Sequence, residues 1–374
     1  MDNTRVSETS SSTLPVNKER ENKWPTSSQL PQPTLLETLA VWTTGYRPDP
    51  VRELQEKSYY DYPALKAPVW SWEIIWYFFM GGLAGGCYVL ATIASLFGAK
   101  EDRIVARVGY YASLLALLPC PPLLIKDLGQ PKKFLNMMRV FKVKSPMSMG
   151  VWGLLTFSMF SALTAVIQAA RDGLLGKWWG AKLLARLPQR ALAVPGSIFA
   201  IFLSGYTGVL LAATSIAVWS RSRMLGALFV SSAFSTSTAL ISCILRIVGA
   251  PVKTLHKLER IEWVNMLIEL VNLLAFLRIT GRAARALVGT GPREKGPTFW
   301  SMMFGSGLVL PWLLQTWLLF KKQPVSPRKK KRGGLGLIVS LLVLLGGYFL
   351  RKTVVEAGHV SSADARTSLW NARR

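Results

Sequence analysis

Four polar side chains recur at helical spacing inside an apolar stretch: Glu262, Asn265, Glu269 and Asn272. Offsets of three, seven and ten residues from the first place all four on one helix face. A carboxylate in mid-membrane must be protonated, paired or hydrated. The pattern therefore fits a proton route or a polar pocket wall, and equally a clamp between helices through the Asn amides. Arg246 is a candidate partner for Glu262 and, less easily, for the deeper Glu269.

The histidines and cysteines limit the redox chemistry of the chain. His256 and His359 are expected in a loop and in a tail, and Cys87, Cys120 and Cys243 lie inside apolar runs. An iron–sulfur cluster takes about four cysteine ligands, and a transmembrane bis-histidine haem needs two histidines within helices. We therefore expect neither a haem nor an iron–sulfur cluster in this chain, and the cysteines should act as small apolar side chains.

A second polar group lies where an apolar segment ends. Residues 118–131 contain three closely spaced prolines, which remove backbone donors and kink a helix end, and Asp127 follows them. Ser145 and Pro146 then form a good helix start, with a capping hydroxyl and a residue that has no donor to lose. On spacing alone, this region is either a functional loop or a tight, well-capped turn back into the membrane.

The composition decides what kind of element must position these residues. Of the 374 residues, 50% are hydrophobic and 17% charged, with 45 Lys and Arg against 20 Asp and Glu and a net charge of +25. The basic residues stand in short clusters between long apolar runs, a pattern that argues against a nucleic-acid-binding domain. It predicts an all-α, polytopic membrane helix bundle.

Eight apolar segments have about the length needed to cross hydrocarbon, roughly 20 residues. They are residues 72–97, 105–125, 147–169, 192–218, 224–248, 261–279, 299–320 and 335–350. Residues 1–69 are expected to be a polar, largely disordered tail with a weak amphipathic piece at 35–42, residues 70–351 the membrane domain, and 352–374 a polar tail. Tyr59, Tyr60 and Tyr62 are expected at the membrane boundary.

Eight spans place both termini on the same side of the membrane, which we call side A. Side A also carries the loops around residues 126–146, 219–223 and 280–298; the opposite face is side B. Counts of Lys and Arg near the spans are similar on the two sides, so the positive-inside rule does not decide cleanly. The dense basic cluster at 328–332, beside Lys321 and Lys322, favours side B as the cytoplasmic side.

Several motifs resemble the polysulfide reductase/NrfD family of membrane subunits. The paired motif is Asp-Leu-Gly-x-Pro at 127–131 with Ser-Pro-Met-Ser-x-Gly at 145–150. Residues 72–86, with their glycine-rich second half, look like the opening helix of the family, and Tyr-Thr-Gly-Val-Leu-Leu at 206–211 looks like its fourth span. The resemblance covers about residues 70–350, and eight spans match the smaller members.

The resemblance implies a membrane anchor of a multi-subunit oxidoreductase in the cell (inner, or cytoplasmic) membrane. Such subunits hold menaquinone or ubiquinone near one face, without haem. A ferredoxin-like iron–sulfur subunit docks on that face, and a large catalytic subunit, such as a molybdopterin protein, often lies beyond it. The chain would then not be a complete enzyme by itself, and its quinone pocket would lie toward side A.

The chain departs from the family pattern at the quinone ligands. In a well-studied branch, an Asn and a His on the first helix hold the quinone, whereas no span here contains a histidine. Glu73 and Tyr77 stand in that neighbourhood, Tyr206 could donate to a quinone carbonyl, and Asp127 or Glu73 could exchange protons with water. The alternative for Tyr206 is a packed ring bonded to a backbone carbonyl, and for Glu73 a water-exposed carboxylate.

Five basic residues after the second span could receive an acidic partner surface on side A, or simply hold anionic lipid head groups: Lys132, Lys133, Arg139, Lys142 and Lys144. Two other classes of function stay open. A secondary transporter or proton conductor would use the polar stripe around Glu269, and a purely structural anchor would lack a quinone site.

Overall fold

The computed structural model describes residues 34–46, 65–176, 178–291, 294–320 and 329–372, with the side chains of 329–333 left aside. Within these residues all regular secondary structure is helical. Eight stretches in the described part are long and apolar enough to cross a membrane. The prediction of an all-α, polytopic membrane bundle is therefore confirmed.

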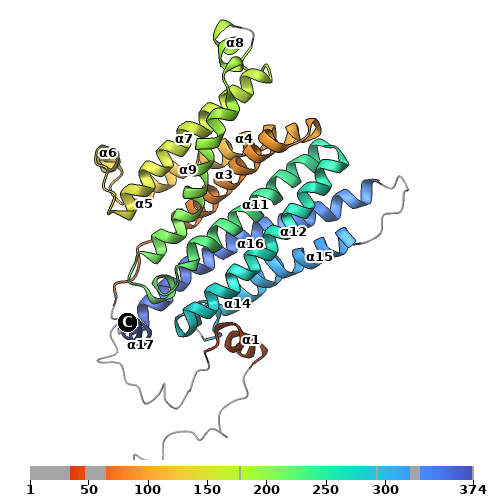
Figure 1. Ribbon diagram of the computed structural model, residues 1–374. Helices are drawn as coiled ribbons and strands as arrows, with labels where there is room; N and C mark the ends of the chain where they lie inside the picture. The colour runs from red at the N-terminus through yellow and green to blue at the C-terminus, as the bar shows by residue number, and fades with distance from the viewer. Residues whose placement is uncertain (1–33, 47–64, 177, 292–293, 321–328, 373–374) are drawn as a thin grey trace, which may run out of the picture.

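The spans are α3 (Trp72–Phe97), α4 (Arg103–Leu117) with α5 (Cys120–Asp127), α7 (Pro146–Arg171), α9 (Gln189–Ala212), α11 (Met224–Val248), α12 (Val252–Thr280), η7 (Phe299–Val309) with α15 (Leu310–Phe320), and α16 (Lys329–Ala363). Short helices lie at their ends: α1 (Leu35–Thr44), α6 (Phe134–Arg139), α8 (Trp179–Arg186), α10 (Ala217–Ser220), η6 (Gly281–Ala284), α13 (Arg285–Val288), α14 (Gly296–Thr298) and α17 (Ala365–Ala372). Figure 1 shows the long helices as one bundle, with α1 and α17 at one end and α8 at the other. The first end is side A.

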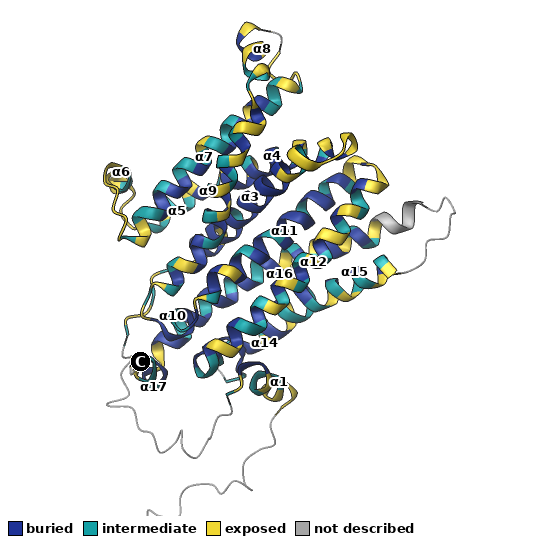
Figure 2. Ribbon diagram, viewed as in Figure 1, coloured by how far each residue is buried: buried dark blue, intermediate teal, exposed yellow. Residues whose placement is uncertain are grey.

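Helices α3 and α11 form the centre of the bundle. α3 packs against α4, α9 and α11, and α11 packs also against α12 and α16. They are the most buried spans, with 89% and 78% of their most apolar stretches inside the protein. Figure 2 shows dark blue along both, whereas the outer helices carry more teal and yellow. The remaining spans surround this pair and expose one side, as expected for helices that face lipid.

The glycine-rich part of α3 lets two neighbouring helices approach closely. A Cβ added at Gly85 would lie 2.3 Å from Ser204 Oγ of α9, and one added at Gly86 would lie 2.2 Å from Ser237 Oγ of α11. The Ser237 hydroxyl donates to the carbonyl oxygen of Leu83 at 3.0 Å. Small residues thus serve close packing, as in many membrane helices.

The hydroxyl-rich span α11 is stable in an apolar setting because many of its hydroxyls bond to backbone. Thr236 Oγ1 donates to the Ser232 carbonyl at 2.8 Å and Thr238 Oγ1 to the Phe234 carbonyl at 2.7 Å. Such bonds to the preceding turn satisfy hydroxyls without help from water. The hydroxyl groups therefore do not prevent α11 from lying at the centre of the bundle.

Helix ends differ from the predicted ones at several places. The last span was expected to end at residue 350, but α16 continues to Ala363 with Val354 and Val355 buried. The expected loop position of His256 and tail position of His359 are wrong, since the two lie in α12 and α16. The cause is that polar residues continue these helices beyond their apolar parts.

The amphipathic piece expected at 35–42 forms α1, which packs against the side-A end of α12. Other predictions fall outside the description. Residues 1–33, the tyrosines at 59, 60 and 62, residues 321–328 and the side chains of 329–332 lie outside the described residues.

Candidate functional site

A narrow cleft near side A brings together three predicted site residues: Tyr77 of α3, Asp127 at the end of α5, and Tyr206 of α9. Its other lining residues are mostly apolar: Trp70, Ile74, Leu124, Met137, Met147, Gly150, Val151 and Leu210. The cavity volume is about 20 Å³, which is room for one or two water molecules. We call it the side-A cleft.

The paired family-like motif builds one wall of this cleft by holding Tyr206. The Tyr206 hydroxyl donates to the carbonyl oxygen of Pro146, and its ring stacks on Phe202 at a centroid distance of 5.4 Å. A Cβ at Gly150 would fall 2.2 Å from Tyr206 Cζ, so only glycine leaves room for the ring. Tyr206 therefore has the backbone-carbonyl bond that the packing interpretation predicts. Its hydroxyl proton is donated to Pro146 and is not available to a ligand.

The start of α7 is capped as the sequence predicts. Ser145 Oγ accepts from the Ser148 amide at 3.4 Å, and Pro146 occupies the first turn. The Ser148 hydroxyl donates to the Val140 carbonyl at 3.1 Å and accepts from the Lys142 amide at 3.0 Å. These bonds fix the chain between α6 and α7 and so place the Pro146 carbonyl beside Tyr206.

The two carboxylates at this end have different surroundings. Asp127 is half-buried on the cleft, and within the described residues its carboxylate makes no hydrogen bond or ion pair. Glu73 does not line the cleft. It is buried, accepts from the Ser71 hydroxyl, and lies 3.3 Å from Lys126 Nζ. The alternative of a water-exposed Glu73 is therefore wrong, because Ser71 and Lys126 cover its carboxylate.

The polar stripe of α12 lies away from the side-A cleft, inside the bundle. Glu262 is fully buried, and neither of its carboxylate oxygens has a hydrogen-bond partner among the described residues. Asn265 Nδ2 donates to Thr238 Oγ1 of α11 at 3.1 Å, as in the helix-clamp interpretation. Glu269 is buried and faces Ser232 and Ser235 of α11. Asn272 is half-buried.

Arg246 does not pair directly with Glu262, so that prediction is wrong. Arg246 Nη2 lies 2.7 Å from Glu259 Oε1, one helical turn earlier on α12. Arg246 Nη1 donates to the Gly336 carbonyl and to Ser340 Oγ of α16, both at 3.1 Å. The reason is that α12 begins before the predicted span and offers the guanidinium a nearer carboxylate.

Arg351 is a buried charge that the sequence analysis missed. It is 1% exposed on α16 and lies within electrostatic reach of Glu269. Its Nη1 donates to Ser232 Oγ at 2.6 Å and to the Gly347 carbonyl at 2.8 Å. The signal that could have found it is the continued helical spacing of apolar residues beyond it, at Val354 and Ala357.

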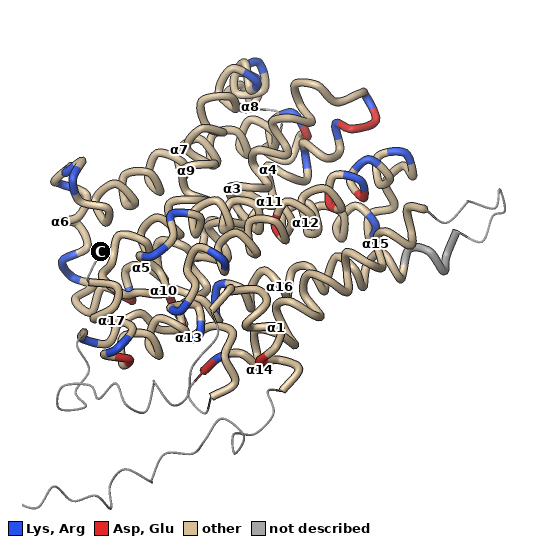
Figure 3. Tube along the Cα trace, turned by 60° about the horizontal axis from the view of Figure 1, so that its bottom comes forward, with Lys and Arg blue, Asp and Glu red and all other residues tan. Residues whose placement is uncertain are grey.

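The five basic residues proposed for docking are all exposed, and they flank or belong to α6: Lys132, Lys133, Arg139, Lys142 and Lys144. Figure 3 shows Lys and Arg gathered at α6 and at both ends of the bundle. Four apolar side chains between them are also more than half exposed: Leu135, Val140, Phe141 and Val143. Residues 132–144, which we call the α6 segment, thus form a basic surface with exposed apolar side chains. The segment adjoins the side-A cleft, which Met137 lines.

Comparison with known proteins now decides the family. The family model described as "Polysulphide reductase, NrfD" matches residues 62–363. The chain belongs to the NrfD polysulphide reductase family. Among its relatives, Protein NrfD of Escherichia coli strain K12 is 28% identical over 281 residues, 67% of this chain and 85% of that protein. The C chain of polysulfide reductase from Wolinella succinogenes is 27% identical over 310 residues, 78% of this protein and 94% of that relative. An NrfD homolog of Haemophilus influenzae is 26% identical over 311 residues, 79% of this protein and 96% of that relative.

The match gives the motif residues a family context. This NrfD-family protein is a multi-pass membrane protein, and the family match contains all eight spans and both halves of the paired motif. The motif places Asp127 on the side-A cleft and Pro146 and Gly150 against Tyr206.

Proposed function

We propose that this protein is the membrane-anchor subunit of a multi-subunit oxidoreductase in the cell's inner membrane. It would exchange electrons between the quinone pool, menaquinone or ubiquinone, and a partner iron–sulfur subunit, with no haem or cluster of its own. The observation that carries the proposal is the convergence of Tyr77, Asp127 and Tyr206 on one apolar cleft at the membrane end that bears the basic α6 segment. The name of the Wolinella relative, the C chain of polysulfide reductase, supports a role within a complex.

The cleft residues fit the chemistry of a quinone. A quinone is a flat apolar ring whose carbonyl oxygens accept hydrogen bonds, and the cleft combines apolar walls with phenol and carboxyl groups. The present volume is too small for the ring, but Met137 and Met147 line it, and unbranched methionine side chains change conformation readily. Bound quinone would supply the two-electron chemistry that the protein's own residues lack.

The residues of this end would then have distinct roles. Tyr77 donates a hydrogen bond to a quinone carbonyl, because the Tyr206 hydroxyl is held by Pro146. Asp127 exchanges protons with water on side A, since it is half-buried and has no partner among the described residues. Glu73, bound by Ser71 and Lys126, holds the neighbouring helix end rather than the quinone.

The exposed α6 segment is the proposed docking surface for the iron–sulfur subunit. Its basic residues suit an acidic partner, and its exposed Phe141 and Val143 provide the apolar contacts that an interface core needs. A large catalytic subunit, such as a molybdopterin protein, would bind the iron–sulfur subunit and not this protein directly.

The experiment is a mild-detergent purification of the native complex, with partners identified by mass spectrometry and clusters followed by EPR. We expect an iron–sulfur subunit whose clusters are oxidised on addition of a quinone analogue.

Variants of the cleft test the site itself. Asp127→Asn should lower quinone-linked turnover by about 100-fold or more, and Tyr77→Phe by about tenfold. Tyr111→Phe is the control, because Tyr111 bonds Asp172 at the side-B end. Full turnover in both cleft variants would contradict the site, and a colourless protein without redox partners would contradict the function.

A second candidate function, proton conduction along the α12 stripe, rests on Glu262, whose buried carboxyl has no hydrogen-bond partner among the described residues. Ionisable groups inside membranes often mark proton routes. The test is proton flux into liposomes that contain the purified protein and a pH-sensitive dye. Flux abolished in Glu262→Gln, but not in the side-A control Glu356→Gln, would support conduction. No flux in the unmodified protein would leave the stripe as packing.

A further inference from the structure

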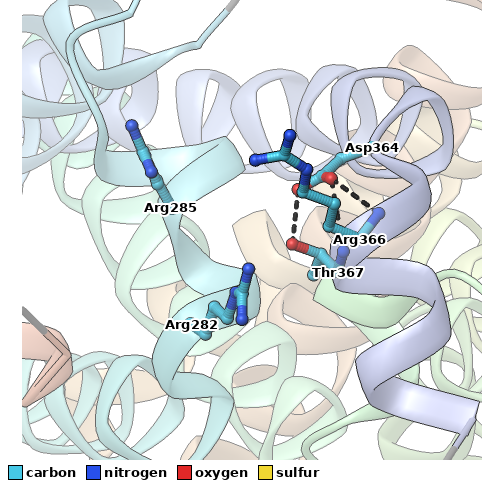
Figure 4. A pocket seen from close by; sticks show the side chains of 5 residues that line it. All are labelled: Arg282, Arg285, Asp364, Arg366 and Thr367. Carbon is cyan, nitrogen blue, oxygen red and sulfur yellow. Dashed lines mark hydrogen bonds between the residues drawn. The ribbon is translucent and has the colours of Figure 1, made fainter. Parts of the chain in front are cut away.

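A second cavity on side A is lined by charge and lies apart from the side-A cleft. Its volume is about 260 Å³, and its lining residues are Arg282, Arg285, Asp364, Arg366 and Thr367. Figure 4 shows Arg282 and Arg285 on one ribbon and the other three residues on another, across the pocket. Among the residues that the structure describes, three arginines and one carboxylate therefore line this space. We call it the arginine pocket.

The Asp364 carboxylate accepts hydrogen bonds from the first residues of α17, the helix that follows it. Asp364 Oδ1 accepts from the amides of Arg366 at 3.0 Å and Thr367 at 3.2 Å, and its Oδ2 accepts from the Thr367 hydroxyl. These bonds cap α17 and fix Arg366 at the pocket's edge. Asp364 thus holds Arg366 in a fixed position at the edge of the pocket.

The opposite wall is equally well supported. Arg282 and Arg285 follow directly after α12, and the residues between them are buried, with Ala283 2% exposed and Ala284 fully covered. Arg285 Nε lies 2.9 Å from Glu294 Oε1, and Arg282 lies over the Tyr46 ring. Because a guanidinium has five N–H donors in a fork, it can hold such neighbours and bond an anion at the same time.

The pocket lies at the ends of two spans, where lipid head groups are expected. It joins the residues that directly follow two spans, α12 and α16. Tryptophans lie at the same end with arginines over their rings, Trp42 with Arg278 at 5.7 Å and Trp370 with Arg221 at 4.1 Å. Tryptophan rings at a bundle end are typical of the membrane–water interface.

We propose that the arginine pocket binds a phosphate group, with Arg282, Arg285 and Arg366 as its ligands. Arginine forks match the oxygens of phosphate, and several guanidinium groups on one anion give charge-assisted bonds. The phosphate belongs either to an anionic phospholipid at the interface or to a free anion from the side-A solution. The site is independent of the proposed quinone chemistry.

The test uses the full-length protein in nanodiscs made of phosphatidylcholine alone or with added phosphatidylglycerol or cardiolipin. Lipid retained on the protein is measured by native mass spectrometry, and inorganic phosphate is titrated separately while the thermal midpoint is followed. The variant Arg282→Gln with Arg366→Gln is compared with Lys182→Gln with Lys253→Gln, which removes the same charge from two exposed positions at side B.

We expect the arginine variant to lose retained anionic lipid by at least about tenfold, and the lysine control to keep it. A thermal shift by inorganic phosphate that the arginine variant lacks would identify free phosphate as the source. If the double variant does not fold, Arg366→Lys keeps the charge without the fork and should bind several-fold more weakly. Equal lipid retention and equal phosphate response in all variants would overturn the proposal.

Discussion

Two regions of this bundle hold ionisable groups in different ways. At the side-A cleft, Asp127 and the tyrosines face a small cavity, and Asp127 is half-buried without a partner among the described residues. Between α11, α12 and α16, by contrast, Glu269 and Arg351 are buried within electrostatic reach of each other and lie beside serines of α11. A buried charge is costly unless it is paired. The interior charges are therefore part of what holds the fold, and the cleft is where a ligand can enter.

The largest effect should come from removing Arg351. Arg351→Met leaves Glu269 without its cationic neighbour and removes the bonds to Ser232 and Gly347. We expect the free energy of unfolding in detergent to fall by about 3–5 kcal/mol, measured by denaturant titration. Adding Glu269→Gln should recover part of the loss, because the uncompensated carboxylate is gone. A change below about 1 kcal/mol for Arg351→Met alone would erase the contrast between the two regions.

A smaller loss of folding stability is expected for a substitution at the wall of the side-A cleft. Gly150→Ala places a Cβ 2.2 Å from Tyr206 Cζ and so forces the ring away from Pro146. Overpacking of this kind costs about 1–3 kcal/mol, which a thermal unfolding series would detect. The matched control is Gly334→Ala in α16, where a Cβ meets no heavy atom within 4 Å. That control should be neutral or slightly stabilising, since alanine favours helix.

Glu262→Gln sharpens the comparison within the interior itself. Because neither Glu262 oxygen has a hydrogen-bond partner among the described residues, a neutral side chain of the same shape loses no bond. We expect the free energy of unfolding to stay within about 1 kcal/mol or to rise. Glu269→Gln should be clearly more destabilising in the same assay, because Glu269 has Arg351 and two serines around it. Equal losses for both would show that Glu262 has a partner in the folded protein.

The smallest effect concerns α1 at the side-A surface. The Thr34 amide and the Thr290 hydroxyl bond to Glu37 and lower its pKa below the usual 4.5. The stabilisation is present above the unfolded-state value and disappears as the pH falls through the lowered folded-state value. Hydrogen-exchange protection of α1 should therefore be constant from pH 7 to about pH 5 and fall in more acidic solution. Glu37→Gln should remove this pH dependence and leave α3 unaffected.

Much of the fold follows from apolar run lengths. α3 spans the predicted residues 72–97 and α11 the predicted 224–248, because turns or glycines bound these runs. Helix ends beyond the apolar core could not be predicted in this way. Arg351 and His359 interrupt the hydropathy signal, yet the backbone continues because buried neighbours such as Val354 pack on the bundle. The ends of a membrane helix depend on tertiary contacts that hydropathy does not report.

The candidate site, like the fold, could be predicted from the sequence only in part. The family-like motifs contain Asp127 and Gly150, which line one cleft, and Pro146, whose carbonyl accepts from Tyr206 beside it. The stripe on α12 was visible from its spacing, but the choice of Glu259 over Glu262 by Arg246 was not. Pairing between helices depends on where each helix begins, and that is set by packing.

Arg351 also has a consequence for how the protein is made. α16 is synthesised after the other seven spans, so α11 and α12 enter the membrane before the guanidinium that faces Glu269 exists. The interior stays incomplete during that interval, with an acidic group inside the bundle and no cation beside it. Insertion of α16 then brings Arg351 within electrostatic reach of Glu269 and lets its guanidinium donate to Ser232 of α11. Assembly quality control that senses unpaired charge would recognise this intermediate and release the finished bundle.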